Sequence, residues 1–247
     1  MAKNETFIAY EGPSLIDGQN IVVLVQTGSS NRKTGDMVQT YILHADIDPI
    51  TASRTGQDSA ICGNCPHRGE AHDGDKGQAK NRTCYVTLAH GPLGKYKAYK
   101  RGAYERVQGH KAIAALGFGR MVRLGTYGDP AAAPSWLWES LISRAQGHTA
   151  YTHGAINPMP ESIMTSADSK AQAQAAWNRG ERTFRVMADK ADLIAAREVL
   201  CPASEEAGKR VTCEACKLCG GASVKGKSVA IVAHGTSKAK AKQLVKG

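Results

Sequence analysis

Short apolar segments recur along the chain from residue 120 onward, and each ends in a polar turn that precedes a segment with helical spacing. This alternation of strand, polar loop and helix is the signature of parallel βαβ units. Strands are expected at 21–26, 38–46, 120–124, 149–152, 162–165, 183–187 and 228–233, and helices at 94–107, 135–146, 170–179 and 190–197. About six such units are too few for a closed eight-fold barrel. The sequence therefore predicts an α/β fold, either a partial (β/α) barrel or an open parallel sheet.

The cysteines fall into two groups with different spacing. Cys62, Cys65 and Cys84 form C-x2-C-x18-C, and the second group forms C-x11-C-x2-C-x2-C with Cys201, Cys213, Cys216 and Cys219. A two-residue gap lets a tight turn aim two thiolates at one metal.

No apolar leader follows Met1, and the longest aliphatic run, 21–25, is too short to span a bilayer. We therefore expect a soluble intracellular protein without a membrane partner, in which the thiols bind metal instead of forming disulfides.

The two groups predict different kinds of metal centre. The consecutive C-x2-C-x2-C rhythm of the second group favours a [4Fe–4S] cluster, with a structural zinc ion as the alternative. The first group has only three thiolates, so a cluster there keeps an open coordination position unless a histidine fills it. The nearby candidates for a fourth ligand are His67, His72 and His90. One or two [4Fe–4S] clusters are expected, in cysteine-rich loops at the carboxyl ends of the strands.

Polar residues follow several of the expected strands. In parallel α/β folds, ligands bind beyond the carboxyl ends of the strands. We therefore expect a shared pocket there, with Asp129, His153 and Asp168 as catalytic groups. Asp168 and Ser169 have the alternative role of capping the helix expected at 170–179.

Domain organisation follows from these elements. No long linker interrupts the units, and a hydrophobic content of 42% is enough to bury a core. We expect an irregular or hairpin segment at 1–37, a single α/β metal-binding domain at 38–236 and a basic tail at 237–247.

Four motifs together resemble a group of uncharacterised bacteriophage proteins, the gene-product-88-like family of unknown function. They are ICGNCPHRG with TCYV, MVRLGTYGDPAAAP, IMTSADS and CPASEEAGKRVTCEACKLCGG. The resemblance covers roughly residues 38–234. It implies a phage or prophage source, and hence the cytoplasm of a bacterial host.

A three-cysteine loop after an early strand of a partial barrel is, more distantly, similar to the radical S-adenosylmethionine enzymes. That resemblance implies that Cys62, Cys65 and Cys84 hold a [4Fe–4S] cluster whose fourth iron site chelates S-adenosylmethionine, and that the four-cysteine group holds an auxiliary cluster. The usual superfamily spacing, C-x3-C-x2-C, differs from the spacing here. Segment 125–129 takes the place of the motif that holds the methionine amine. The implied cofactor-binding residues are Gly125, Tyr127, Gly128 and Ser166.

The chain is basic, with 32 Lys and Arg against 22 Asp and Glu. This excess predicts an anionic partner, either a substrate or nucleic acid. The expected helix at 94–107 interleaves tyrosines with cations, a pattern that suits phosphate contacts and base stacking, although the tyrosines could equally pack into the core. Two function classes follow. One is an iron–sulfur enzyme acting on an anionic substrate, and the other is a non-catalytic zinc- or cluster-stabilised protein that binds nucleic acid or a host protein.

Overall fold

The computed structural model describes residues 4–154, 160–208 and 211–246. Its first sheet has six strands in the order β4–β1–β2–β3–β5–β6. They are β1 (Thr6–Pro13), β2 (Asn20–Gln26), β3 (Val38–His44), β4 (Glu105–Arg106), β5 (Met121–Tyr127) and β6 (Gly147–Thr149). The β1–β2 and β2–β3 pairs are antiparallel, whereas β3–β5 and β5–β6 are parallel.

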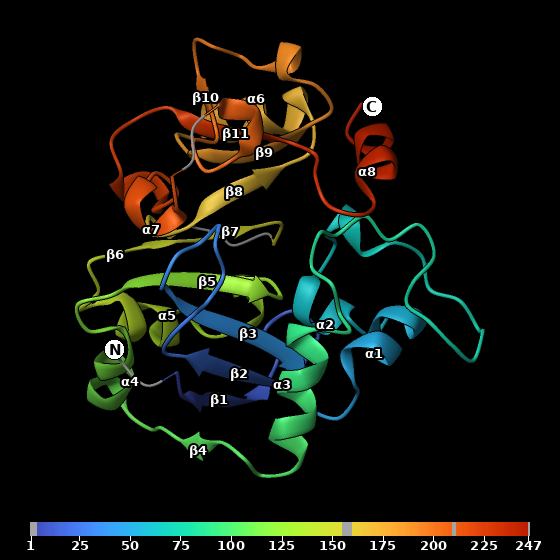
Figure 1. The fold of residues 1–247 in the computed structure, drawn as a ribbon, viewed down its shortest axis with the longest axis vertical. Helices are drawn as coiled ribbons and strands as arrows, with labels where there is room; N and C mark the ends of the chain where they lie inside the picture. Colours follow the sequence, from blue (N-terminus) through green and yellow to red (C-terminus); the bar gives the residue numbers. More distant parts are fainter. Residues whose placement is uncertain (1–3, 155–159, 209–210, 247) are drawn as a thin grey trace.

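The second sheet has five parallel strands in the order β10–β11–β9–β8–β7. They are β7 (Tyr151–Thr152), β8 (Met164–Ala167), β9 (Thr183–Met187), β10 (Glu198–Leu200) and β11 (Ser228–Val232). Only Ala150 separates β6 from β7, so one chain segment passes from the first sheet into the second. Figure 1 shows the resulting succession of strands from β1 near the bottom, through β5 and β8, to β10 near the top. The predicted α/β class and the parallel strand pairing are confirmed.

The central strands are continuous apolar runs. Five consecutive residues of β2 are buried, as are all five of β11. Such runs are typical of strands that are covered on both faces. The larger core cluster joins β2, β3 and β5 to the helices beside them.

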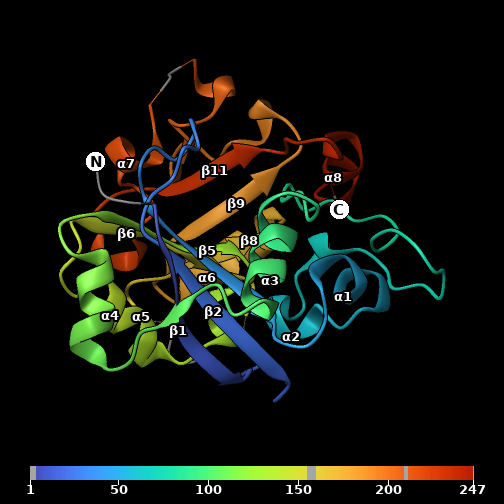
Figure 2. The same ribbon diagram turned by 60° about the horizontal axis from the view of Figure 1, so that its bottom comes forward.

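The described residues form eight α-helices: α1 (Pro49–Thr55), α2 (Ser59–Cys62), α3 (Gly91–Lys100), α4 (His110–Gly117), α5 (Ser135–Ile142), α6 (Lys170–Asn178), α7 (Cys213–Cys216) and α8 (Lys238–Leu244). None of the described helices is long and apolar enough to cross a lipid bilayer. In two views, α1 and α2 lie on the opposite side of the molecule from α4 and α7 (Figures 1 and 2). The two cysteine-bearing helices, α2 and α7, therefore lie toward opposite ends of the strands.

Two of the predicted helices have other bounds in the structure. The helix expected at 94–107 is α3, which ends before Gly102, whose φ of +69° breaks the helix, and the chain then forms β4. The helix expected at 190–197 is a single 3₁₀ turn, Lys190–Asp192. The segment 1–37, expected to be irregular or a hairpin, contains the hairpin β1–β2, and β2 pairs with β3 in the same sheet. The basic tail contains α8, which buries Ala241.

Candidate functional site

The three cysteines of the first group line one cavity. Cys62, Cys65 and Cys84 border a space of about 110 Å³. The loops that follow β3, β5 and β7 supply most of its wall. Six of the residues predicted from the strand ends and the resemblance also line it: Gly125, Tyr127, Gly128, Asp129, His153 and Ser166.

The long gap between Cys65 and Cys84 is closed by backbone hydrogen bonds. The N–H groups of Thr83 and Cys84 both donate to the carbonyl of His67, at 3.1 and 3.0 Å. Glu70 and Lys80 form an antiparallel bridge, with N···O distances of 2.8 and 2.9 Å. Residues 70–80 are therefore an excursion that is closed at its base. This excursion explains how an 18-residue gap still brings the third thiol beside the first two.

Two arginines hold the backbone of these loops. The Arg68 guanidinium donates to Asp58 Oδ1 at 2.9 and 2.7 Å and to the Gly63 carbonyl at 2.7 Å, which fixes the turn between the first two cysteines. Arg82 Nη1 donates to the carbonyls of Cys84 and Val86, at 3.1 and 2.9 Å. Both guanidinium groups border the same cavity as the thiols.

The turn that follows β5 packs against the helix that carries Cys62. The N–H of Asp129 donates to the Ile61 carbonyl at 2.6 Å. Gly128 has a φ of +83°, and a Cβ there would lie 2.6 Å from Ile42 Cβ. Only glycine fits this approach, so the turn lies directly beside the first thiol.

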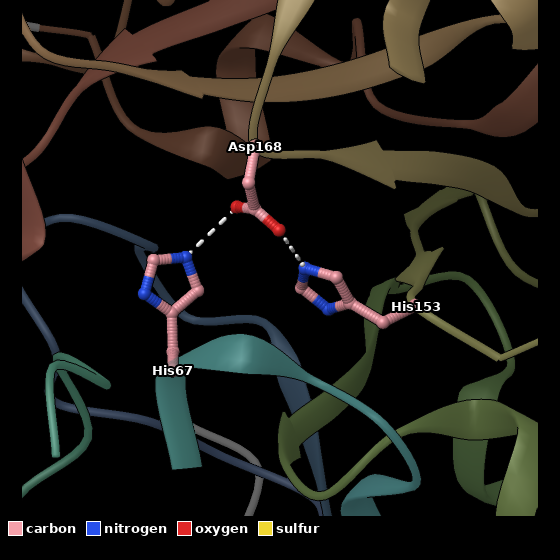
Figure 3. Close-up of side chains that lie close together, drawn as sticks. All are labelled: His67, His153 and Asp168. Atoms are coloured by element: carbon pink, nitrogen blue, oxygen red, sulfur yellow. Dashed lines mark hydrogen bonds and ion pairs between the residues drawn. The ribbon is translucent and has the colours of Figure 1, made fainter. Parts of the chain in front are cut away.

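Beside the cavity, Asp168 is held between two histidines (Figure 3). His67 Nε2 lies 2.9 Å from Asp168 Oδ1, and His153 Nε2 lies 3.0 Å from Asp168 Oδ2. His67 Nδ1 contacts Thr83 Oγ1 at 2.8 Å, so both nitrogens of this buried ring have partners. The backbone N–H of His153 donates to Asp129 Oδ2 at 2.8 Å. The three predicted catalytic residues, Asp129, His153 and Asp168, are therefore brought together.

These contacts set the charge states around the cavity. Burial favours neutral His153, but its contacts with Asp168 and Cys65 outweigh this and raise the pKa of His153 to about 11. Burial opposes the Asp168 carboxylate, yet the two histidines hold its pKa well below the usual range. Burial raises the pKa of the Cys62 and Cys84 thiols. These thiols therefore keep their protons at neutral pH, and a metal bound by them would have to displace those protons.

The distances between candidate ligand atoms distinguish a site for a single metal ion from a site for a larger metal cluster. Among the described residues, one set of three candidate ligand atoms lies within 4.8 Å of one another. These atoms belong to His67, His153 and Asp168. Neither cysteine group has that spacing. A tetrahedral zinc ion with Zn–S bonds of about 2.3 Å holds its thiolates about 3.8 Å apart. The cysteine groups are therefore more open than a single zinc ion requires.

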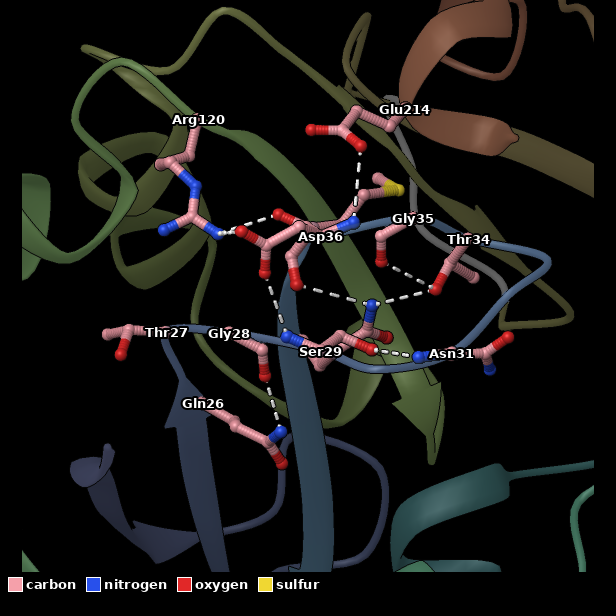
Figure 4. A network of polar contacts seen from close by, with 12 residues as sticks. Gln26, Thr27, Gly28, Ser29, Asn31, Thr34, Gly35, Asp36, Arg120 and Glu214 are labelled. Carbon is pink, nitrogen blue, oxygen red and sulfur yellow. Dashed lines mark hydrogen bonds and ion pairs between the residues drawn. The ribbon is translucent and has the colours of Figure 1, made fainter. Parts of the chain in front are cut away.

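The second cysteine group lies against the segment that leads into β3. The N–H groups of Cys213 and Glu214 donate to the carbonyls of Lys33 and Thr34, at 3.0 and 3.1 Å. The Glu214 carboxylate accepts from the N–H of Asp36 at 3.1 Å (Figure 4). The expectation that this loop lies at the carboxyl ends of the strands is not confirmed, because Cys213 and Glu214 bond to the segment that leads into β3. Cys219 is near enough to Cys201, Cys213 and Cys216 for their charges to interact, but among the described residues no three of these sulfurs all lie within 4.8 Å of one another.

Other predicted residues lie elsewhere. His72 is half-buried and contacts the Gln78 carbonyl at 3.1 Å, and His90 is exposed at the start of α3. Ser169 caps α6 by accepting from the N–H of Gln172 at 3.2 Å, whereas Asp168 turns to the histidines. Base stacking and packing into the core were the two alternatives for the tyrosines of the expected helix. Tyr96, Tyr99 and Tyr104 pack partly buried against the core.

Sequence reasoning missed four residues around the cavity: Arg68, Arg82, Thr83 and Tyr85. Each is next to or close to a cysteine or His67 in the sequence, in PHRG or NRTCY. That proximity was the available signal. It did not specify which of these side chains point toward the cavity.

We expect Gly69→Ala to open the base of the 70–80 excursion. Gly69 has a φ of +84°, and a Cβ there would lie 2.3 Å from the Lys80 carbonyl oxygen. The variant should lower both the free energy of unfolding and the amount of bound metal that the sequence predicts for the first cysteine group. The matched control is Gly77→Ala, because Gly77 has a similar φ of +86° but no atom within 4 Å of its added Cβ. Equal metal content in the two variants would contradict the steric argument.

Comparisons of the chain with protein-family models, with curated proteins and with solved structures found no match. The functional argument therefore rests on the chain's own residues and their geometry.

Proposed function

We propose that the chain is a phage-type iron–sulfur protein, a radical-S-adenosylmethionine-like enzyme that acts on an anionic substrate. In this proposal Cys62, Cys65 and Cys84 hold an open [4Fe–4S] centre. The observation that carries it is the shared cavity. Cys84 lines it together with Cys62, Cys65 and segment 125–129, although 18 residues separate Cys65 from Cys84 in the sequence.

The donor set fits a cluster with one open iron. The first group supplies three thiols and no fourth cysteine. Its spacing is wider than one zinc ion requires, and a cube of four irons spaces its thiolates farther apart than a single ion does. When bound, a centre of this kind supplies an electron for the reductive cleavage of S-adenosylmethionine, which begins hydrogen abstraction from a substrate.

The chain's own residues prepare the surroundings of this centre. The 125–129 turn supports cofactor binding, because Gly125 and Gly128 leave backbone without side chains at the cavity wall. Asp129 holds the turn and the backbone of His153 together. Because its pKa is high, His153 is a cation at neutral pH, and it adds to the charges of Arg68 and Arg82. Asp58 and Asp129 line the same cavity, and Asp168 pairs with His153, so the charges at the cavity nearly balance. The support for an anionic substrate is therefore the net charge of the chain, +10.

The strand order supports a partial barrel as the scaffold of this centre. Parallel strands continue from β3 and β5 through β6 and β7 to β8, β9 and β11, across the single residue Ala150. The three-cysteine loop follows β3, the first strand of this parallel series. The four-cysteine group is proposed to hold a second cluster, in the role of an auxiliary centre.

The test is anaerobic purification followed by iron, sulfide and zinc analysis with an optical spectrum. Two [4Fe–4S] clusters require about eight irons per chain with matching sulfide. We expect this result, together with reductive cleavage of added S-adenosylmethionine. Zinc without sulfide would overturn the proposal.

A second candidate function is a non-catalytic zinc-stabilised protein that binds nucleic acid or a host protein. The compact His67–His153–Asp168 group favours it, since two imidazoles and a carboxylate within 4.8 Å suit a single zinc ion. It predicts one zinc per chain that is lost in His67→Ala, and nucleic-acid affinity that falls steeply with salt. The packing of Tyr96, Tyr99 and Tyr104 against the core reduces the stacking surface that this function would use.

A further inference from the structure

Arg123, on β5, is a buried cation without a carboxylate partner among the described residues. Arg123 as a whole residue is only 8% exposed. Its Nη2 donates to the hydroxyls of Tyr85 and Tyr151, at 2.5 and 2.9 Å, and its Nε has no hydrogen-bond partner. Phenols with ordinary pKa values near 10 are neutral at physiological pH, so they do not balance the charge.

The four-cysteine group lies next to this cation. Cys213 and Cys219 are close enough to interact electrostatically with the guanidinium. The backbone shows the same proximity: the Cys219 carbonyl accepts from the N–H of Ala150 at 3.0 Å, and the preceding residue, Thr149, is the cross-strand partner of Arg123.

Two further cations border the same group. Lys33 interacts electrostatically with Cys201 and Cys213, and Arg182 with Cys219. Arg182 also donates to the carbonyls of Leu218 and Gly221, at 3.0 and 2.7 Å, which holds the cysteine loop. Its Nε, like that of Arg123, is buried without a hydrogen bond. The cysteine group is thus bordered by three cations.

A buried charge of one sign is costly unless an opposite charge lies nearby. Four thiolates around a metal centre carry net negative charge, since each thiol loses its proton on binding. We infer that Arg123 is the counter-cation of an anionic iron–sulfur centre held by Cys201, Cys213, Cys216 and Cys219. This inference rests on the proposed function, because it requires the second cluster.

Arg123 also connects the two cysteine groups. Its partners Tyr85 and Tyr151 line the cavity of the first group, and Tyr85 directly follows Cys84. The guanidinium therefore lies between the cavity and the second centre. Its charge stabilises the reduced, more negative state of the four-cysteine cluster and so sets that cluster's reduction potential.

The test is a redox titration of the four-cysteine cluster, followed by electron paramagnetic resonance, in the Cys62→Ala background. We expect Arg123→Met to shift the reduction equilibrium at least tenfold toward the oxidised state, which is a potential lower by 59 mV for a one-electron couple. Arg123→Lys keeps the charge and should stay near the parent value. Tyr151→Phe controls for the lost hydrogen bond, because it leaves the cation in place.

The outcomes separate this inference from the proposed function. An intact cluster with an unchanged potential in Arg123→Met would overturn the inference and leave the proposed function standing. Absence of iron from the four-cysteine group in the unmodified chain, or zinc in its place, would overturn both the second cluster and the inference. If Arg123→Met does not accumulate as folded protein, Arg123→Gln provides the neutral variant, with the same expected direction.

Discussion

Replacing Cys62 with alanine is expected to remove about four irons per chain and to abolish reductive cleavage of S-adenosylmethionine. Cys62 ends α2, and the neighbouring Ile61 carbonyl accepts the hydrogen bond from Asp129. Two remaining thiols do not hold a cube that needs three protein ligands. The measurements are iron and sulfide content, and the yield of cleaved cofactor under reducing conditions. Cleavage at the unmodified level would contradict the assignment of the open centre.

The matched control is Cys216→Ala in the second group. Cys216 lies on α7, at the other end of the strands from α2 (Figure 1). This variant should lose the iron of the four-cysteine group and keep that of the three-cysteine group, with cleavage retained. If each variant loses only the iron of its own cysteine group, the iron content of the two variants shows how much iron each group binds. Loss of all iron in both variants would mean that the two groups do not load independently.

The strands could be predicted from the sequence because their signal is local. Runs such as NIVVLVQ in β2 and SVAIV in β11 are apolar over their whole length, which is typical of strands covered on both faces. The gathering of Asp129, His153 and Asp168 also followed from a local rule, since each residue comes just after a strand of a parallel set.

The long-range contacts could not be predicted in the same way. Cys84 reaches the first two cysteines only because its N–H and that of Thr83 bond to the His67 carbonyl. The second cysteine group lies near the start of β3 because it bonds to Lys33 and Thr34, which are about 180 residues earlier in the chain. Neither the hydrophobic periodicity nor the cysteine spacing near Cys213 indicates these partners.

The choice among the histidines also depended on tertiary contacts. His67, His72 and His90 were equivalent as neighbours of the cysteines in the sequence. Only His67 is buried with partners for both ring nitrogens, Thr83 and Asp168. Those partners come from different loops, so the sequence did not distinguish this histidine from the other two.

The largest loss of stability is expected from Glu198→Ala. Glu198 accepts two hydrogen bonds from Arg185, each at 2.7 Å, and the two side chains are 0% and 3% exposed. The substitution leaves the Arg185 guanidinium buried without its partner, which costs about 3–5 kcal/mol of unfolding free energy. That is a large part of the total stability of a typical domain, about 5–15 kcal/mol. Urea denaturation followed by circular dichroism measures the change.

Two comparisons isolate the buried charge as the cause. Arg106→Gln removes the cation of an exposed pair with Glu11, and it should cost less than about 1 kcal/mol. The double variant Arg185→Met with Glu198→Leu removes both buried charges and keeps apolar volume, so it should recover much of the stability that Glu198→Ala loses. If the double variant is as unstable as Glu198→Ala, lost packing and not the unpaired guanidinium explains the effect. Recovery would show that the pair is costly to break because its charges are buried, the same reasoning that requires an anion beside Arg123.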